Sequence, residues 1–172
     1  MNVTLPARSF FAFAFPCRFR ENPPVIDGRL EDWDERFRVP DLMGLEGGEP
    51  FGKVYMAWNR EGLYFAVDAG RKERFHVDPL KPEAGDCLRL WIDTRDVRDT
   101  RRAGRYCHQF VVLPEGGGPG GKRPLVSREK IALAREQSGM TDAATVEAAC
   151  RLDRRLHRYR MEIAIPAEAL TG

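Results

Sequence analysis

The sequence predicts an all-β fold, an antiparallel β-sandwich of the jelly-roll kind, and three observations lead to it. Apolar and polar residues alternate with a period of two in several short segments. Clusters of turn-forming residues separate those segments, and sustained helical periodicity is nearly absent. The 172 residues suit one domain, spanning residues 1–172, which is long enough to bury a core without metal or disulfide cross-links.

Six segments carry the clearest alternation, and we expect each of them to form a strand. A turn at 60–62 joins the first two into a hairpin. An additional N-terminal strand is expected over 8–17, where phenylalanine alternates with alanine. The six segments are 53–59, 63–69, 86–93, 105–113, 144–152 and 158–166.

The apolar side of each expected strand predicts the core, because successive side chains point to opposite faces of a strand. Trp33 follows an Asp-Gly turn and is expected to pack against it. The predicted core residues are Val54, Met56, Trp58, Leu63, Phe65, Val67, Leu88, Leu90, Ile92, Phe110, Val112, Ile163 and Ile165.

Two segments lie outside the alternating pattern. The stretch "SREKIALAREQ" (127–137) fits either a helical turn or an edge strand. The glycine-rich stretch "PEGGGPGGKRP" (114–124) is predicted to be a flexible surface loop that opens an excursion from 114 to 143. A phosphate cradle needs glycines that lead into a helix, but Pro119 and Pro124 interrupt this run. We therefore expect a strand connector.

The charge balance argues against a nucleic-acid-binding function. Lys and Arg number 28 against 26 Asp and Glu, so the formal net charge is only +2. Two arginine-rich stretches, 95–105 and 151–160, are broken by aspartate or apolar residues and are predicted to be solvated faces. No segment has the length of a membrane span, and 8–17 lacks the cleavage site of a signal peptide.

The four cysteines indicate neither a zinc site nor a redox pair, because no two of them have the required spacing. Unpaired cysteine inside a strand behaves as a small hydrophobe, which favours a reducing compartment such as the cytoplasm. The even number also leaves disulfides open. The cysteines are Cys17, Cys87, Cys107 and Cys150.

The sequence offers no catalytic constellation, so we do not expect an enzyme. Cys107 and His108 are adjacent on an expected strand, so their side chains should point to opposite faces and cannot act as nucleophile and base. No metal site is expected from the three histidines, which fall in separate segments. A calcium site remains an alternative to a turn-forming role for four aspartates, which are Asp86, Asp93, Asp96 and Asp99.

One strand face combines an aromatic ring with polar side chains. Arg89 and Trp91 share a face, and Gln109 and Val111 lie beside them if strands 86–93 and 105–113 pair. A flat indole beside hydrogen-bonding groups is a suitable platform for a sugar or another small ligand. In the alternative interpretation, Trp91 packs beneath the 114–143 excursion as a core residue.

Four motifs occur in an order that resembles carbohydrate-binding module family 9 and the related DOMON-like β-sandwiches. They are "PPVIDGRLEDWDE", "KVYMAWNREGLYFAVDA", "GDCLRLWIDTRD" and "RYRMEIAIPAEAL", and the resemblance covers Val25 to Leu170. It implies a non-catalytic sugar-binding domain associated with glycan degradation. In that family one or two strands follow the Ile-Pro element, so the resemblance also implies that this chain lacks its last strands and has an exposed sheet edge.

We therefore predict a non-catalytic carbohydrate-binding module whose ligand face consists of Trp91, Arg89 and Gln109. Two alternatives remain. Related sandwiches carry haem in redox subunits, for which the available donors here are Met56, Met140 and the histidines. A protein-interaction domain would instead pair a partner strand with the exposed sheet edge.

Overall fold

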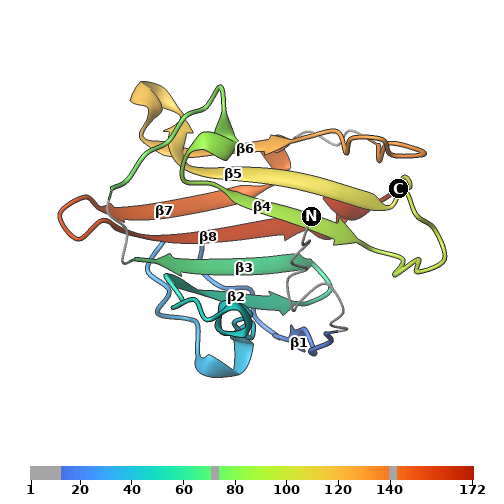
Figure 1. Cartoon of the computed structure of the whole chain (residues 1–172), viewed down its shortest axis with the longest axis horizontal. Coiled ribbons are helices and arrows are strands. Elements are labelled where there is room, and N and C mark those ends of the chain that lie inside the picture. The colour runs from blue at the N-terminus through green and yellow to red at the C-terminus, as the bar shows by residue number, and fades with distance from the viewer. Residues whose placement is uncertain (1–12, 71–73, 140–142) are drawn as a thin grey trace, which may run out of the picture.

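The computed structural model describes residues 13–70, 74–139 and 143–172, and in this part of the chain the fold is all-β (Figure 1). Its only helical elements there are short 3-10 turns: η2 (Glu35–Phe37), η3 (Met43–Glu46), η4 (Pro82–Ala84), η5 (Pro119–Gly121), η6 (Ala143–Thr145) and η7 (Ala167–Leu170). None of the described helical turns has the length and hydrophobicity needed to cross a bilayer.

The strands form two sheets. The five-stranded sheet has the order β1-β2-β3-β8-β7, and the three-stranded sheet has the order β4-β5-β6. All pairs are antiparallel except β1 with β2. The strands are β1 (Arg18–Phe19), β2 (Gly52–Trp58), β3 (Gly62–Ala69), β4 (Leu88–Asp93), β5 (Cys107–Gly117), β6 (Arg123–Arg128), β7 (Glu147–Asp153) and β8 (Arg158–Pro166).

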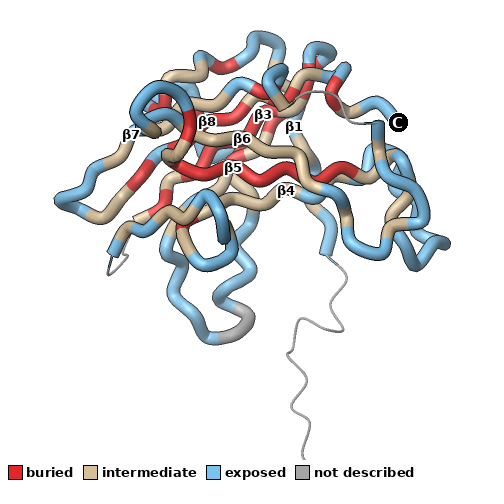
Figure 2. Tube along the Cα trace, turned by 90° about the horizontal axis from the view of Figure 1, so that it is seen from above, coloured by how far each residue is buried: buried red, intermediate tan, exposed pale blue. Residues whose placement is uncertain are grey.

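Apolar side chains from both sheets form one core, as the alternating pattern predicted. Phe65 and Val67 of β3 are buried with Phe110 and Val112 of β5, and the apolar residues of β8 complete the cluster. Ile163 and Ile165 are fully buried, and the predicted core residues of β4 are half-buried against the same cluster. In Figure 2, β5 is buried along most of its length, between the less buried β4 and β6.

A second core covers the opposite face of the five-stranded sheet. Trp33 and Phe37, from the segment that precedes β2, pack on Tyr55, Ala57, Tyr64 and Ala66. Both faces of β2 and β3 are therefore apolar, so alternation alone could not show which side faces the other sheet. Trp33 is buried near the turn, as expected.

A buried carboxylate attaches this covering segment to the sheet. Glu162 is in the middle of β8, and one of its oxygens accepts N–H groups of Asp27 and Gly28 at 3.0 and 2.6 Å. Its other oxygen accepts the indole N–H of Trp33 at 2.9 Å. Gly28 has a φ of +77°, and a Cβ there would lie 3.0 Å from the backbone nitrogen of Arg151. The "IDG" turn and Trp33 are thus structural partners of Glu162.

Two local predictions were wrong, those for 114–124 and for the N-terminal strand, and the open choice for 127–137 is resolved only for its start, which belongs to the edge strand β6. The 114–124 stretch is not a flexible loop, because β5 continues to Gly117 and β6 begins at Arg123, so most of it is a hairpin inside the expected 114–143 excursion. The 127–137 stretch is strand only to Arg128 and then forms turns. Residues 13–17 of the expected N-terminal strand are irregular, and 8–12 lie outside the described residues.

Trp58 was also predicted wrongly, because it is 41% exposed. It lies at the end of β2, where its ring packs edge-on against Phe19 with centroids 5.3 Å apart. Its indole N–H donates to the carbonyl of Cys17 at 3.1 Å. Trp58 therefore holds the β1 segment rather than filling the core.

Candidate functional site

The predicted ligand residues meet on the outer face of the three-stranded sheet, the face turned away from the other sheet. Leu88, Leu90 and Ile92 of β4 pack against the shared core, so the alternating residues Arg89 and Trp91 face outward. The register between β4 and β5 sets Trp91 opposite Gln109 and Arg89 opposite Val111.

Hydrogen bonds fix the orientation of Trp91. Its indole N–H donates to Gln109 Oε1 at 3.1 Å, and Gln109 Nε2 donates to Glu129 Oε2 at 2.9 Å. The same Glu129 oxygen lies 3.6 Å from Arg89 Nη1, while Arg89 Nη2 lies 3.5 Å from Glu83. We call Arg89, Trp91, Gln109 and Glu129 the Trp91 platform. These contacts leave the ring little freedom to turn.

In the Trp91 platform, an exposed ring lies beside side chains that are buried. Trp91 is 62% exposed, whereas Gln109 is only 7% exposed and Val111 is fully buried. The alternative in which Trp91 packs beneath the 114–143 excursion as a core residue is therefore wrong. The ring presents an apolar surface to solvent, and the polar groups that surround it can donate and accept hydrogen bonds.

The cysteine–histidine pair has no shared site. His108 is on the core side of β5 opposite Ile92, and Cys107 is on the outer side opposite Asp93. His108 is fully buried, and its Nδ1 contacts an amino nitrogen of Arg128, so the neutral ring accepts that hydrogen bond. Burial lowers the pKa of His108, and the charge of Arg128 lowers it further. The carbonyl of Leu170 acts in the opposite direction, although its geometry does not make a hydrogen bond to Nε2.

Three of the four aspartates considered for calcium, Asp86, Asp93 and Asp96, make hydrogen bonds or ion pairs within the protein. Asp86 accepts the backbone N–H of His76 at 2.9 Å. Asp93 accepts the N–H groups of Arg95 and Val97, and Asp96 pairs with Arg98 at 2.7 Å. In residues 13–70, 74–139 and 143–172, no three His, Cys, Asp or Glu side chains gather as a metal site would require. These contacts favour the turn-forming role.

The remaining donors considered for haem or disulfides are dispersed in the fold. Met56 packs against the shared core, His76 is exposed and Met140 lies outside the described residues. All four cysteines have free thiols. Burial raises the pKa of Cys150 to about 12, so that thiol is neutral and unreactive at physiological pH.

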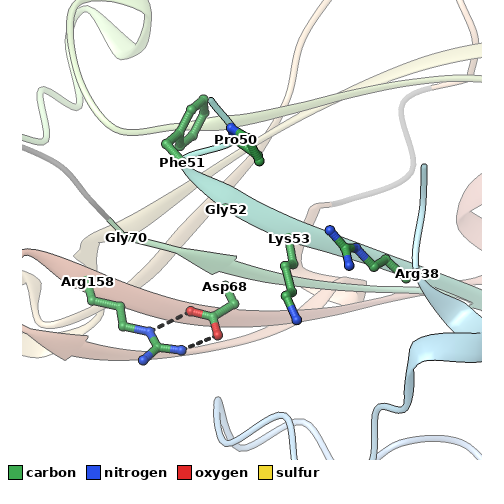
Figure 3. Close-up of a pocket in the computed structure, with 8 residues that line it drawn as sticks. All are labelled: Arg38, Pro50, Phe51, Gly52, Lys53, Asp68, Gly70 and Arg158. Atoms are coloured by element: carbon green, nitrogen blue, oxygen red, sulfur yellow. Dashed lines mark hydrogen bonds and ion pairs between the residues drawn. The ribbon is translucent and has the colours of Figure 1, made fainter. Parts of the chain in front are cut away.

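A separate hollow of about 390 Å³ lies where β2 begins, and its charges are paired (Figure 3). Arg158 donates through Nε to Asp68 at 2.7 Å and contacts the same carboxylate through Nη2. Glu35 accepts from Lys53 at 2.9 Å and from Arg38 at 3.1 Å. Each cation of this hollow already has a carboxylate partner, so it is a weaker candidate site than the Trp91 platform.

Sequence reasoning found three members of the Trp91 platform and missed Glu129. That residue was assigned to an ambiguous segment, and only the pairing of β5 with β6 brings it beside Gln109, whose carbonyl accepts the Glu129 N–H at 3.0 Å. Comparison of the chain with family models, curated proteins and solved structures finds no match.

Proposed function

We propose that this protein is a non-catalytic carbohydrate-binding module that holds a sugar ring on the Trp91 platform. The observation that supports the proposal is the exposed indole whose orientation is set by a chain of hydrogen bonds through Gln109 and Glu129. A pyranose has an apolar face that can cover an indole, and its hydroxyl groups need donors and acceptors at the rim. Arg89 and Glu129 supply these groups.

Rigid presentation favours binding, because a ring that is already held in place loses little conformational entropy when the ligand arrives. The buried side chains beneath the platform, Gln109 and Val111, prevent the surface from collapsing when no ligand is bound. The motif order seen in the sequence supports the same function.

The experiment is a glycan-array screen followed by calorimetric titration of the best ligand. Trp91→Ala should weaken binding by about tenfold or more. Trp58→Ala is the matched control, because Trp58 is also an exposed tryptophan on a strand but lies on the other sheet. Equal affinity of the parent and Trp91→Ala for every glycan that binds would overturn the proposal.

A second candidate function is pairing with a partner strand, and one observation favours it. Among the described strands, β4 pairs only with β5, so its other edge is open along the Trp91 platform. A protein partner that pairs with the backbone of this edge should tolerate Trp91→Ala, whereas a saccharide that stacks on the ring should not. Binding measured by calorimetry with the parent and Trp91→Ala separates the two functions.

A further inference from the structure

An arginine-lined pocket continues the outer face on which the Trp91 platform lies. Its volume is about 220 Å³, and Asp93 and Cys107 are among its lining residues. These two residues are register partners, each two positions from Trp91 and Gln109 on the same strands. Because strands rise about 3.4 Å per residue, the two pairs are about 7 Å apart on one face. One saccharide can therefore span both.

Three arginines line this pocket. Arg102 and Arg105 come from the loop between β4 and β5, and Arg135 comes from the segment after β6. The Arg135 N–H donates to the carbonyl of Ala103 at 2.8 Å, which joins the two segments. In Figure 1 both segments lie at the end of the molecule where β4 ends and β5 begins. We call Arg102, Arg105 and Arg135 the arginine cluster.

The arginine cluster differs from the other cationic hollow of the protein. Within the described part of the chain, none of its three side chains has an ion-pair partner. Asp93, at the pocket wall, accepts two backbone N–H groups, and Glu136, the other carboxylate there, pairs with none of the three arginines. The pocket lining therefore holds three cations against two carboxylates, and none of the cations is neutralised by an ion pair with a described residue, which favours an anionic ligand.

Tyr106 gives the pocket a fixed wall. The guanidinium carbon of Arg95 lies 4.4 Å from the centre of its ring, and that of Arg105 lies 5.1 Å away. These cation–π contacts limit the motion of Arg105 and leave its N–H groups available. The arrangement fits a planar carboxylate or a sulfate, which guanidinium groups bind through paired hydrogen bonds.

We propose that the ligand is an acidic saccharide, whose ring stacks on Trp91 while its carboxylate or sulfate group binds the arginine cluster. This inference rests on the proposed carbohydrate-binding function and specifies its ligand class. The arginine-rich stretch 95–105, predicted from sequence to be merely solvated, then has a function in recognition.

The test compares binding of a galacturonate oligomer with binding of its methyl-esterified neutral form; a sulfated dextran oligomer and unsulfated dextran form the second pair. The acidic member of at least one pair should bind about tenfold more tightly. Which pair shows the preference distinguishes carboxylate from sulfate. The preference should decrease when the salt concentration rises, because screening weakens contacts between exposed charges.

Four variants locate the effect. Arg105→Gln and Arg135→Gln should each remove most of the acidic preference, and Glu136→Gln should strengthen acidic binding. Arg98→Gln is the matched control, because Arg98 belongs to the same loop but pairs with Asp96 and does not line the pocket. Melting temperatures identify any variant that fails to fold.

The outcomes separate this inference from the proposed function. Equal binding of acidic and neutral forms, abolished by Trp91→Ala, would overturn the acidic ligand and leave the carbohydrate-binding function standing. Absence of binding to any saccharide would overturn both. An equal loss in Arg98→Gln and Arg105→Gln would show a diffuse charge effect and overturn the assignment to the arginine cluster.

Discussion

The outer faces of the two sheets each carry a tryptophan with a hydrogen-bonded indole N–H, yet they differ in accessibility. On the five-stranded sheet, Trp33 is 8% exposed and donates to Glu162, a carboxylate that is itself buried. On the three-stranded sheet, Trp91 is 62% exposed and donates to Gln109. The chain covers the first face with its own segment and leaves the second open.

The comparison teaches that the partner of an indole, rather than the indole itself, distinguishes a structural site from a binding surface. Glu162 also binds two backbone N–H groups of another segment, so its removal affects the whole covering layer. Gln109 and Glu129 bind side chains of the same sheet, so they orient the ring without covering it.

The largest expected effect comes from disrupting the covered face of the five-stranded sheet. Glu162→Gln keeps the size of the side chain but replaces one acceptor oxygen by an N–H₂ group that meets N–H donors. Leaving buried donors without an acceptor should lower the free energy of unfolding by roughly 3–5 kcal/mol. Urea denaturation measures this, with the exposed Glu147→Gln as the control on the neighbouring strand β7. A loss below about 1 kcal/mol would show that the covering segment is held by its apolar contacts alone.

The effect of intermediate size concerns His108, the buried histidine on the core side of β5. Its pKa is lowered in the folded state, so the unfolded chain binds the proton more tightly and folding is opposed by acid. This contribution to stability is complete above about pH 6.5 and decreases below it, by at most about 1.4 kcal/mol per pH unit.

Melting temperatures between pH 5 and pH 7 measure this dependence. His108→Gln should reduce the slope, while the exposed His76→Gln should retain it. An unchanged slope in His108→Gln would assign the acid sensitivity to the carboxylates instead.

The smallest expected effect concerns Trp91 on the uncovered face of the three-stranded sheet. Trp91→Phe should change the free energy of unfolding by less than about 0.5 kcal/mol, because the ring contributes little to the core. It should also remove the largest share of acrylamide-quenchable fluorescence, and Trp33→Phe the smallest. If the quenchable part of the fluorescence is as large in Trp91→Phe as in the parent, the indole of Trp91 is shielded in solution.

Alternation predicted the main strands because each of them has at least one mostly apolar face. It failed at Trp58, because position along a strand, and not only the face, decides burial, and the shared core does not extend over the end of β2. Glu162 could have been noticed as a single acid in the centre of an apolar strand. Its partners could not, since they lie 129 to 135 residues away.

The glycine-rich stretch shows a different limit. Composition suggested flexibility, but Gly118, Gly120 and Gly121 adopt positive φ values in a tight connection. A Cβ at Gly117 would lie 2.4 Å from the carbonyl of Pro124, so glycine permits the two strands to approach there. The arginine cluster was equally hidden, because only folding brings Arg135 beside the 95–105 stretch.

The position of β8 between β3 and β7 has a consequence for how the chain folds as it is synthesised. Neither face of the five-stranded sheet can be completed before β8 emerges from the ribosome. Before then β3 lacks its second neighbouring strand, and the N–H of Gly28 lacks the carboxylate of Glu162, 134 residues away. Until then the apolar residues of β2 and β3 stay accessible to chaperones or to other chains. The contacts that close the fold span most of its length, and this topology favours slow folding.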